Sequence, residues 1–295
     1  MCNWVPKGGQ RSACRGHGSS VHWNPGTLEI MARGKLRLGG MALQNGVLVH
    51  GPTAWGCSIR LPSGELRVAS GRKRFLASRV GGQPLLRGPA RLLETLALLP
   101  NVRRALPGAR FPFERPGVVA AIATSTLFGA GLGRSGGTTA ARELLRGLAA
   151  LGPAVLALRG GELSAYHGAE HVSIGTYEHG EPREKEHERC GSHLIGPLLA
   201  TTSLGNVLAS QAPAHLRGVA RLGASVGALA ATTELFGWMV RHPENGLSRL
   251  LSKPGYELQR RLATSEPSPE QLEVAEAALT ACLELEAADV SSNQN

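Results

Sequence analysis

GGMALQNGVLVHGPTAWGCSIRLPSGELRVASGR, residues 39–72, is the part of this chain that alternates like a β-sheet. Its short runs VLVH, CSIRL and ELRVAS are separated by turn-forming segments at Gly51-Pro52 and at Pro62 to Gly64. Alternating runs between such turns are typical of antiparallel strands. The sequence therefore predicts a small antiparallel β unit within residues 35–80.

Beyond this unit the apolar residues recur with the period of a helix. One broad apolar side is formed by Leu85, Leu86, Leu92, Leu93, Leu96 and Leu98, which predicts a helix from about Pro84 to Leu99. Further along, Ser268, Pro269 and Gln271 form a helix start of the capping-box type. The fold class expected from these patterns is mainly α, with a helical domain over residues 81–287.

The two ends of the chain carry no periodic pattern. Residues 1–34 are rich in Gly, Ser, Arg and Asn and lack the apolar segment of a secretory signal peptide, so we expect a disordered leader. Residues 288–295 should form a disordered tail. The five cysteines are odd in number and irregularly spaced, which is not the pattern of a disulfide framework and favours a reducing compartment.

The formal net charge of +10 favours an anionic neighbour. The arginines are scattered and lack the interleaved aromatic residues on which bases stack, so a dedicated nucleic-acid role is not expected. Anionic lipid fits the same charge.

Four apolar stretches bear on the membrane question, at residues 117–133, 144–158, 194–209 and 222–240. A spanning helix needs roughly 20 mainly apolar residues. These stretches are short, rich in glycine, or interrupted by a charged, polar or proline residue. Hydropathy alone leaves buried helices of a soluble protein and membrane helices equally open.

The segment YHGAEHVSIGTYEHGE, residues 166–181, contains the strongest chemical pattern. On a helix, His167, Glu170 and His171 point the same way. Two imidazoles four residues apart can bind one zinc ion while the carboxylate acts on a bound water. The alternative is a solvated polar helix, since a motif this short also occurs by chance.

Downstream, the segment EKEHERCGSH adds His187 and Cys190, which could reach the same ion. Four bound ligands would make a closed, structural zinc site, whereas three would leave a position for water, with Glu170 as the general base. Glu178 could support an imidazole or be a surface charge. Glu234, an acid inside an apolar run, should be paired, neutral or bound to an ion unless it is exposed.

Several blocks together resemble the YqhQ family, a bacterial domain of unknown function labelled a predicted metal-dependent enzyme. The resemblance lies in GGMALQNGVLVHGP, YHGAEHVSIGTYEHGE, HERCGS and LSRLLSKPGYELQRRLATSEPSPEQLEVAEAALTACL. It implies multi-pass membrane helices between the blocks. The family's functional positions fall on His167, Glu170, His171, Tyr177, Glu178, His187, Cys190 and Glu234. Asn45, where the family carries an acid, and Glu188, where proline is common, depart from its pattern.

With this resemblance, we expect a membrane-embedded helical bundle with a small N-terminal β unit, located at the cytoplasmic membrane, with the cytoplasm as the alternative. The expected partner is membrane lipid. The expected cofactor is a divalent metal, zinc, bound by His167, His171, His187 and Cys190, with Glu170 catalytic. The function expected is metal-dependent hydrolysis of an unknown substrate. The alternative is a non-enzymatic membrane assembly or transport factor with a structural metal site.

Overall fold

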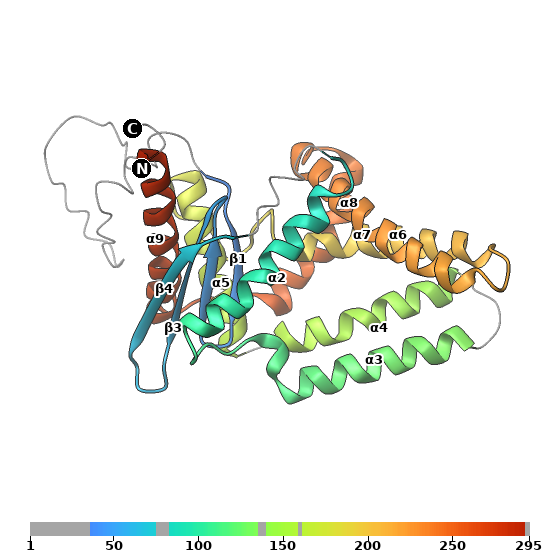
Figure 1. The fold of residues 1–295 in the computed structure, drawn as a ribbon, viewed down its shortest axis with the longest axis horizontal. Coiled ribbons are helices and arrows are strands. Elements are labelled where there is room, and N and C mark those ends of the chain that lie inside the picture. The colour runs from blue at the N-terminus through green and yellow to red at the C-terminus, as the bar shows by residue number, and fades with distance from the viewer. Residues whose placement is uncertain (1–35, 75–82, 135–139, 159–160, 293–295) are drawn as a thin grey trace, which may run out of the picture.

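The structure, a computed structural model, describes residues 36–74, 83–134, 140–158 and 161–292. The leader predicted for residues 1–34 lies outside the described residues. Within them the chain is mainly helical and has a small antiparallel sheet near its N-terminal end, as the sequence predicts (Figure 1).

The sheet has four antiparallel strands in chain order: β1 (Gly39–Leu43), β2 (Gly46–His50), β3 (Ala54–Arg60) and β4 (Leu66–Arg72). Leu48 pairs with Cys57 across β2 and β3, so the register follows the alternating runs. Val47 and Val49 point to one face of the sheet and Leu48 to the other, and all three are fully buried. Both faces are therefore covered, although a small antiparallel sheet can leave one face to water.

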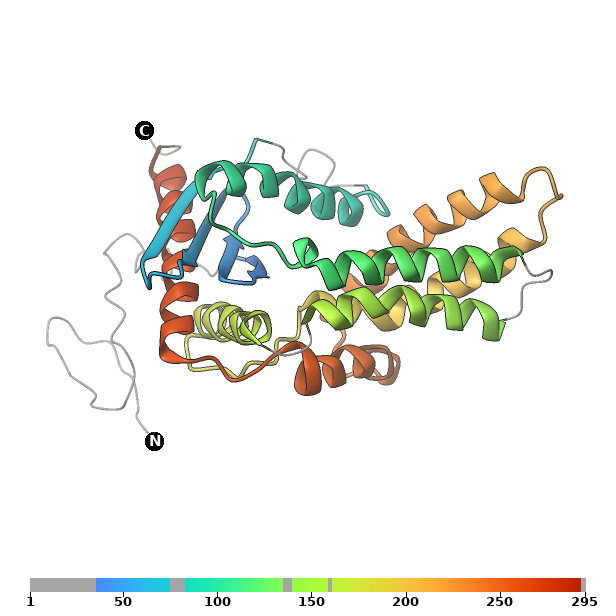
Figure 2. The ribbon, with the colours of Figure 1, turned by 90° about the horizontal axis from the view of Figure 1, so that it is seen from below.

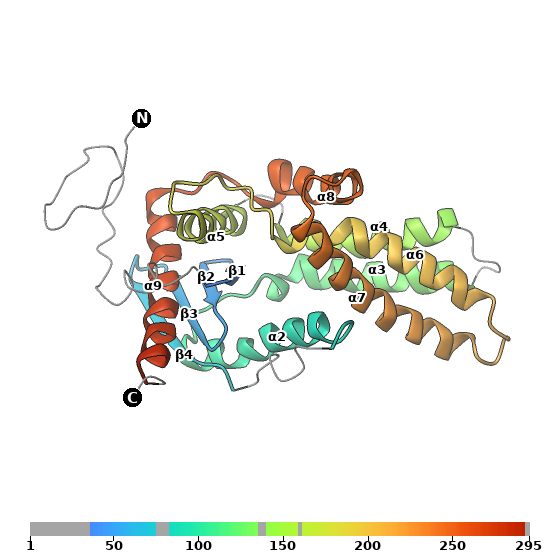
Figure 3. The same cartoon turned by 90° about the horizontal axis from the view of Figure 1, so that it is seen from above.

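Helices from distant parts of the chain cover the two faces. On one face pack α5 (Glu162–His179) and α9 (Pro269–Ser292), and on the other packs α2 (Arg87–Ala105) (Figure 3). At Gly56 a side chain would collide with the backbone of α9, so this glycine allows β3 and the helix to approach closely. The last helix therefore completes the core that the first strands begin, and it continues to Ser292, past residue 287 where the sequence predicts an end.

Helix α2 buries only part of the apolar side that the leucine pattern predicts. Its buried residues are Ala90, Glu94, Leu98 and Val102, whereas Leu92 and Leu93 are exposed. Glu94 is buried because it pairs with Lys73 at 3.2 Å. The helix therefore turns a side that contains a buried ion pair toward the sheet, which sequence periodicity could not indicate.

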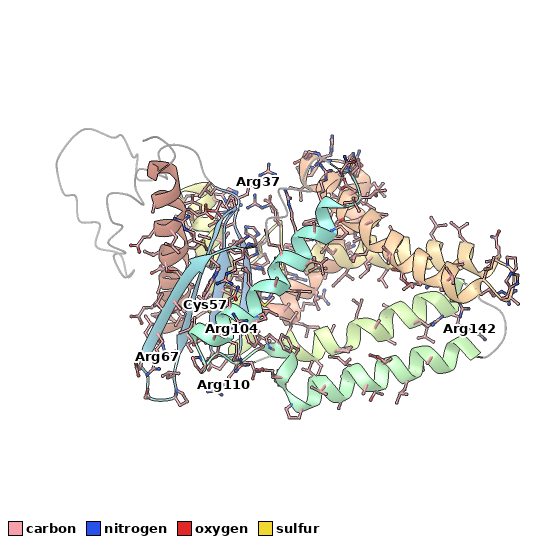
Figure 4. The ribbon with its side chains drawn as sticks, viewed as in Figure 1. Arg37, Cys57, Arg67, Arg104, Arg110 and Arg142 are labelled. Carbon is pink, nitrogen blue, oxygen red and sulfur yellow. The ribbon has the colours of Figure 1, made fainter. Side chains whose placement is uncertain are left out.

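Two antiparallel helical hairpins project from the sheet, and we call them the arm. The first is α3 (Pro116–Arg134) with α4 (Ala140–Leu158), and the second is α6 (Ile195–Ser210) with α7 (Arg217–Arg241) (Figures 1 and 2). These helices include the four predicted apolar stretches. Figure 4 shows Arg142 near the far end of the arm and Cys57 within the sheet. Helix α8 (Gly246–Leu258) packs against the start of α6 and the short turn that precedes it.

Large apolar side chains along the arm are exposed. They are Val119, Ile122, Leu127, Phe128, Leu145, Leu148, Leu156, Leu204, Leu208, Val219, Leu222 and Val226. Among the helices that the structure describes, none combines the length and apolar character needed to cross a bilayer.

Candidate metal centre

Helix α5 places the central motif in the interior of the protein. The helix follows Gly161, whose φ is 76°, and ends at Gly180 in the left-handed conformation that favours glycine. Most of its residues are buried on all sides, because the sheet, α9 and the loop after α5 surround it. At Gly168 a side chain would collide with the backbone of Ser265. The helix is therefore a core helix, which excludes the solvated polar helix.

Three of the predicted ligands converge. His167 and His171 from α5 and Cys190 from the following loop each offer one ligand atom, and these atoms all lie within 4.8 Å of one another. The Sγ of Cys190 is 3.5 Å from Nε2 of His167. In a tetrahedral zinc site, bonds of about 2.0–2.3 Å separate the donor atoms by about 3.5 Å. The arrangement thus fits a zinc-type ion after small side-chain adjustments.

Backbone carbonyls bind Nδ1 of both imidazoles and leave Nε2 of each free for a metal ion. The Nδ1–H of His167 donates to the oxygen of Ala263 at 2.8 Å, and that of His171 donates to the oxygen of Lys185 at 2.5 Å. Such a bond fixes the tautomer and leaves a free lone pair on Nε2. Metal-binding histidines commonly donate their other ring N–H to a backbone carbonyl or carboxylate in this way. Both rings are therefore prepared as ligands through Nε2.

The protonation of the cluster also suits a cation. Burial, with His167 second, holds the pKa of His171 well below its usual value, so this imidazole is neutral as a ligand must be. Burial raises the pKa of the Cys190 thiol. A cation would reverse that effect, because a coordinating thiol is deprotonated by the metal.

Glu170 lies beside these three residues and is buried. Desolvation, its largest cause, raises the pKa of its carboxyl to about 7, with His167 opposing and Cys190 adding to the shift. Its Oε2 has no hydrogen-bond partner among the described groups. An orphaned buried carboxylate oxygen is costly, and a cation or a bound water nearby would satisfy it.

Room for Glu170 comes from β1, where a side chain at Gly40 would overlap the glutamate carboxylate. Gly40 is not among the site residues that the sequence predicts. The signal was the glycine pair Gly39-Gly40 inside a strand pattern, because glycine there marks a close approach of another group.

A π turn, Gln259–Ala263, organises the loop that bears Cys190. Its Gln259 is fully buried; Oε1 accepts from the N–H of His187 at 2.9 Å, and Nε2 donates to Ser192 Oγ at 2.7 Å. The same turn supplies the Ala263 carbonyl behind His167. Single π turns inside helices often lie at functional sites. Gln259 is not among the site residues that the sequence predicts, since no local pattern signals such a contact.

The fourth predicted ligand, His187, lies one ring further out. Its ring centroid is 5.5 Å from that of His171, and it is not among the three clustered ligands. Its Nε2 is 3.3 Å from Glu178 Oε2, and its Nδ1 accepts from the N–H of Arg189 at 3.2 Å. Both ring nitrogens are engaged in hydrogen bonds, so in this structure His187 packs beside the cluster and is not one of its ligands.

The remaining predicted acids have charged partners. Glu178 is bound by the guanidinium of Arg189 as well as by His187, so it is not a plain surface charge. Glu234, on α7, accepts from Nε of Arg87 at 2.8 Å, so it is paired and is not brought to the cluster. Tyr177 is buried, and its hydroxyl accepts from the N–H of Leu36 at 3.2 Å.

Residues 162–285 match the model of a family described as "Protein of unknown function (DUF1385)". The match begins with the first residue of α5 and ends inside α9, so it contains the clustered ligands, Glu170 and the π turn, and omits the sheet. No curated protein and no solved structure has a significant match to the chain. The centre therefore lies in a region similar to a family whose description names no activity, metal or substrate.

Proposed function

We propose that this protein is a metal-dependent hydrolase that uses a zinc-type ion. The observation that carries the proposal is the convergence of His167, His171 and Cys190 with the unpartnered carboxylate of Glu170 beside them. The label of the YqhQ family, a predicted metal-dependent enzyme, agrees with it. Three protein ligands are the usual number in catalytic zinc sites, where a fourth position stays open.

His167, His171 and Cys190 would hold the ion, and when bound it would supply Lewis-acid polarisation and a lowered pKa for water. Glu170 would act as the general base. Its ionised carboxylate can take up a proton from a bound water, because a cation at the cluster would oppose the burial that raises the pKa of this carboxyl. Its Oε2 is free to do so because no described group binds it. The hydrolase hypothesis thus gives each of the four side chains a role.

The rival is a non-enzymatic membrane factor in which the metal only holds the fold. The carboxylate of Glu170 also supports this rival function. As a fourth ligand it would leave no position for water, which is typical of a structural zinc site. Both functions predict zinc in the protein. They differ in what the loss of the Glu170 charge does.

Elemental analysis of the purified protein, with His167→Ala as control, tests the metal first. We expect zinc in the wild type and its loss in the variant. Glu170→Gln should then retain the metal and lose at least about 100-fold of the hydrolysis of p-nitrophenyl esters and phosphates, since general base catalysis contributes about 10²–10⁴-fold. A wild type without zinc contradicts both functions. Zinc loss, or unchanged hydrolysis, in Glu170→Gln contradicts the catalytic role.

We also infer that the arm lies against a lipid surface. Its apolar side chains are exposed, and its four helices contain six arginines against two glutamates. Apolar area combined with positive charge is what binds a helix to an anionic membrane surface. This proposal agrees with the expected location at the cytoplasmic membrane.

A further inference from the structure

A cavity of about 820 Å³ adjoins the metal centre. Its walls are the loop after α5, the last part of α7 and one side of α8. His187 lines the cavity, and its ring is 5.5 Å from that of His171. The clustered ligands and Glu170 do not line the cavity themselves, so His187 is the residue that connects the cavity with the centre.

The α8 wall offers hydrogen-bond donors and positive charge. Arg249 and Lys253 lie one turn apart on this helix, and neither has an ion pair with a described residue. Ser248 lines the same cavity; its side chain is only 3% exposed, and its Oγ has no hydrogen-bond partner among the described groups. A buried hydroxyl without a partner costs free energy. An acceptor in the cavity would remove that cost.

The opposite wall contains glutamates, and most are already compensated. Glu178 is bound by Arg189, Glu186 lies 3.5 Å from Lys185, and Glu188 lies 3.9 Å from an arginine of the same loop. Glu184 is exposed. Arg249 and Lys253, which are also exposed, outnumber Glu184, so the α8 wall carries the excess charge that attracts an anion.

The rest of the lining is apolar. Phe236, Met239 and Val240 come from α7, and Tyr256 comes from α8. Ligand sites commonly combine such an apolar lining with a few convergent polar groups. A ligand that fills this cavity would need an apolar part as well as an acidic one.

We propose that the cavity binds an amphipathic anion as the substrate of the metal centre. The acidic group contacts Ser248, Arg249 and Lys253, and the apolar part packs against Phe236 and Met239. A phosphate-type headgroup suits this wall, because it offers several acceptor oxygens to a guanidinium, an ammonium and a hydroxyl. The inference rests on the proposed function, since the ligand is a substrate only if the cluster holds a metal.

Isothermal titration calorimetry of the full chain with hexyl phosphate, inorganic phosphate and 1-hexanol separates the two parts of the ligand. We expect hexyl phosphate to bind at least about tenfold more tightly than either of the others. Inorganic phosphate has no methylenes to bury, and 1-hexanol lacks the charged oxygens that accept charge-assisted hydrogen bonds. Equal affinity for inorganic phosphate would overturn the apolar part of the proposal. Equal affinity for 1-hexanol would overturn the acidic part.

Variants of the α8 wall locate the binding. Arg249→Ala/Lys253→Ala should weaken hexyl phosphate at least about tenfold, since charge-assisted hydrogen bonds contribute about 1.5–3 kcal/mol each. The control Arg91→Ala/Arg104→Ala removes the same charge from exposed positions of α2, outside the cavity and the arm, and should leave the affinity unchanged. Ser248→Ala should weaken binding without lowering the melting temperature, because its hydroxyl has no partner to lose.

If both double variants weakened hexyl phosphate binding equally, the proposed binding site on the α8 wall would be wrong. Zinc content, measured on the same samples, keeps the two proposals apart. A protein that contains zinc and does not bind hexyl phosphate contradicts only the cavity as a site for this ligand. Binding of hexyl phosphate by a wild type without zinc contradicts the metal-dependent function, and with it the role of the ligand as substrate.

Discussion

Two buried polar clusters lie on opposite sides of β1, and adjacent glycines make room for both. A side chain at Gly40 would overlap Glu170 on the α5 side, and one at Gly39 would lie 2.7 Å from Nε2 of His50 on the α2 side. Because successive residues of a strand point to opposite faces, two adjacent glycines leave space for a polar cluster on each side of the strand. The second cluster ties the sheet to α2 through His50, Lys73 and Glu94.

The His50 cluster predicts a pH dependence of stability. Burial, with Lys73 second, lowers the pKa of His50 from 6.5 to about 4. Between pH 6.5 and 4 the unfolded chain binds a proton at His50 and the folded chain does not. The free energy of unfolding is therefore unaffected by His50 above pH 6.5 and decreases as the pH falls toward 4. Urea unfolding at several pH values across this window measures it.

The matched variant for this prediction is His50→Gln, which keeps a polar side chain but cannot take up the proton. The free energy of unfolding of the variant should fall less steeply with decreasing pH than that of the wild type. Because the other histidines remain in both proteins, the difference between the two slopes isolates His50. Identical slopes would contradict the lowered pKa.

At the scale of single elements, the sequence predicted which site residues share a face of one helix. It did not predict site contacts that depend on segments far apart in the chain. The spacing of His167, Glu170 and His171 fixes their common face once α5 forms. The position of Cys190 was also predicted, and three of the four expected ligands converge. His187 differs because its backbone is bound by Gln259, which lies 72 positions away in the chain and has no local signature.

The π turn can be tested through Gln259→Leu. We expect the zinc affinity to fall about 10- to 100-fold, the usual cost of removing a group that positions the ligands. Competition with a chromogenic chelator measures the affinity. The absorption of the cobalt-substituted protein reports whether the Cys190 sulfur still binds, which a general loss of stability would not change.

Gln271→Leu is the matched control, because this glutamine also makes side-chain hydrogen bonds, but to Ser268 and Glu162 rather than to the loop that bears Cys190. It should lower stability by about 1 kcal/mol, a typical capping contribution, and leave the zinc affinity unchanged. Equal zinc affinities in both variants would show that the π turn does not position the centre.

At the scale of the whole molecule, composition and periodicity predicted a β unit followed by helices, and the structure confirms this order. They could not predict that α5 and α9 share one face of the sheet, or that two hairpins project together as the arm. Such arrangements depend on contacts between segments far apart in the chain. Periodicity reports only which side of an element is apolar.

The arm carries the prediction at this scale. The protein should sediment with phosphatidylglycerol vesicles, because the exposed apolar side chains and the arginines both favour an anionic bilayer surface. Leu204→Gln/Leu208→Gln, which changes two leucines that are 62% and 58% exposed on α6, should lower the bound fraction several-fold. Co-sedimentation at fixed lipid concentration provides the measurement.

Leu92→Gln/Leu93→Gln on α2 is the control, since these leucines are 45% and 61% exposed but lie outside the arm. It should leave vesicle binding as it is in the wild type. An equal loss in both double variants would contradict a specific role of the arm, and so would a wild type that stays in the supernatant.

The covering of the sheet by α9 has a consequence for biosynthesis. The ribosome releases β1 to β4 long before it makes Pro269–Ser292, so the part of this sheet face that α9 covers remains in contact with water while both hairpins of the arm are translated. An uncovered apolar sheet face and its unpaired edges invite aggregation during that interval. Chaperones that shield nascent chains would therefore act chiefly on the first strands, until the C-terminal helix arrives.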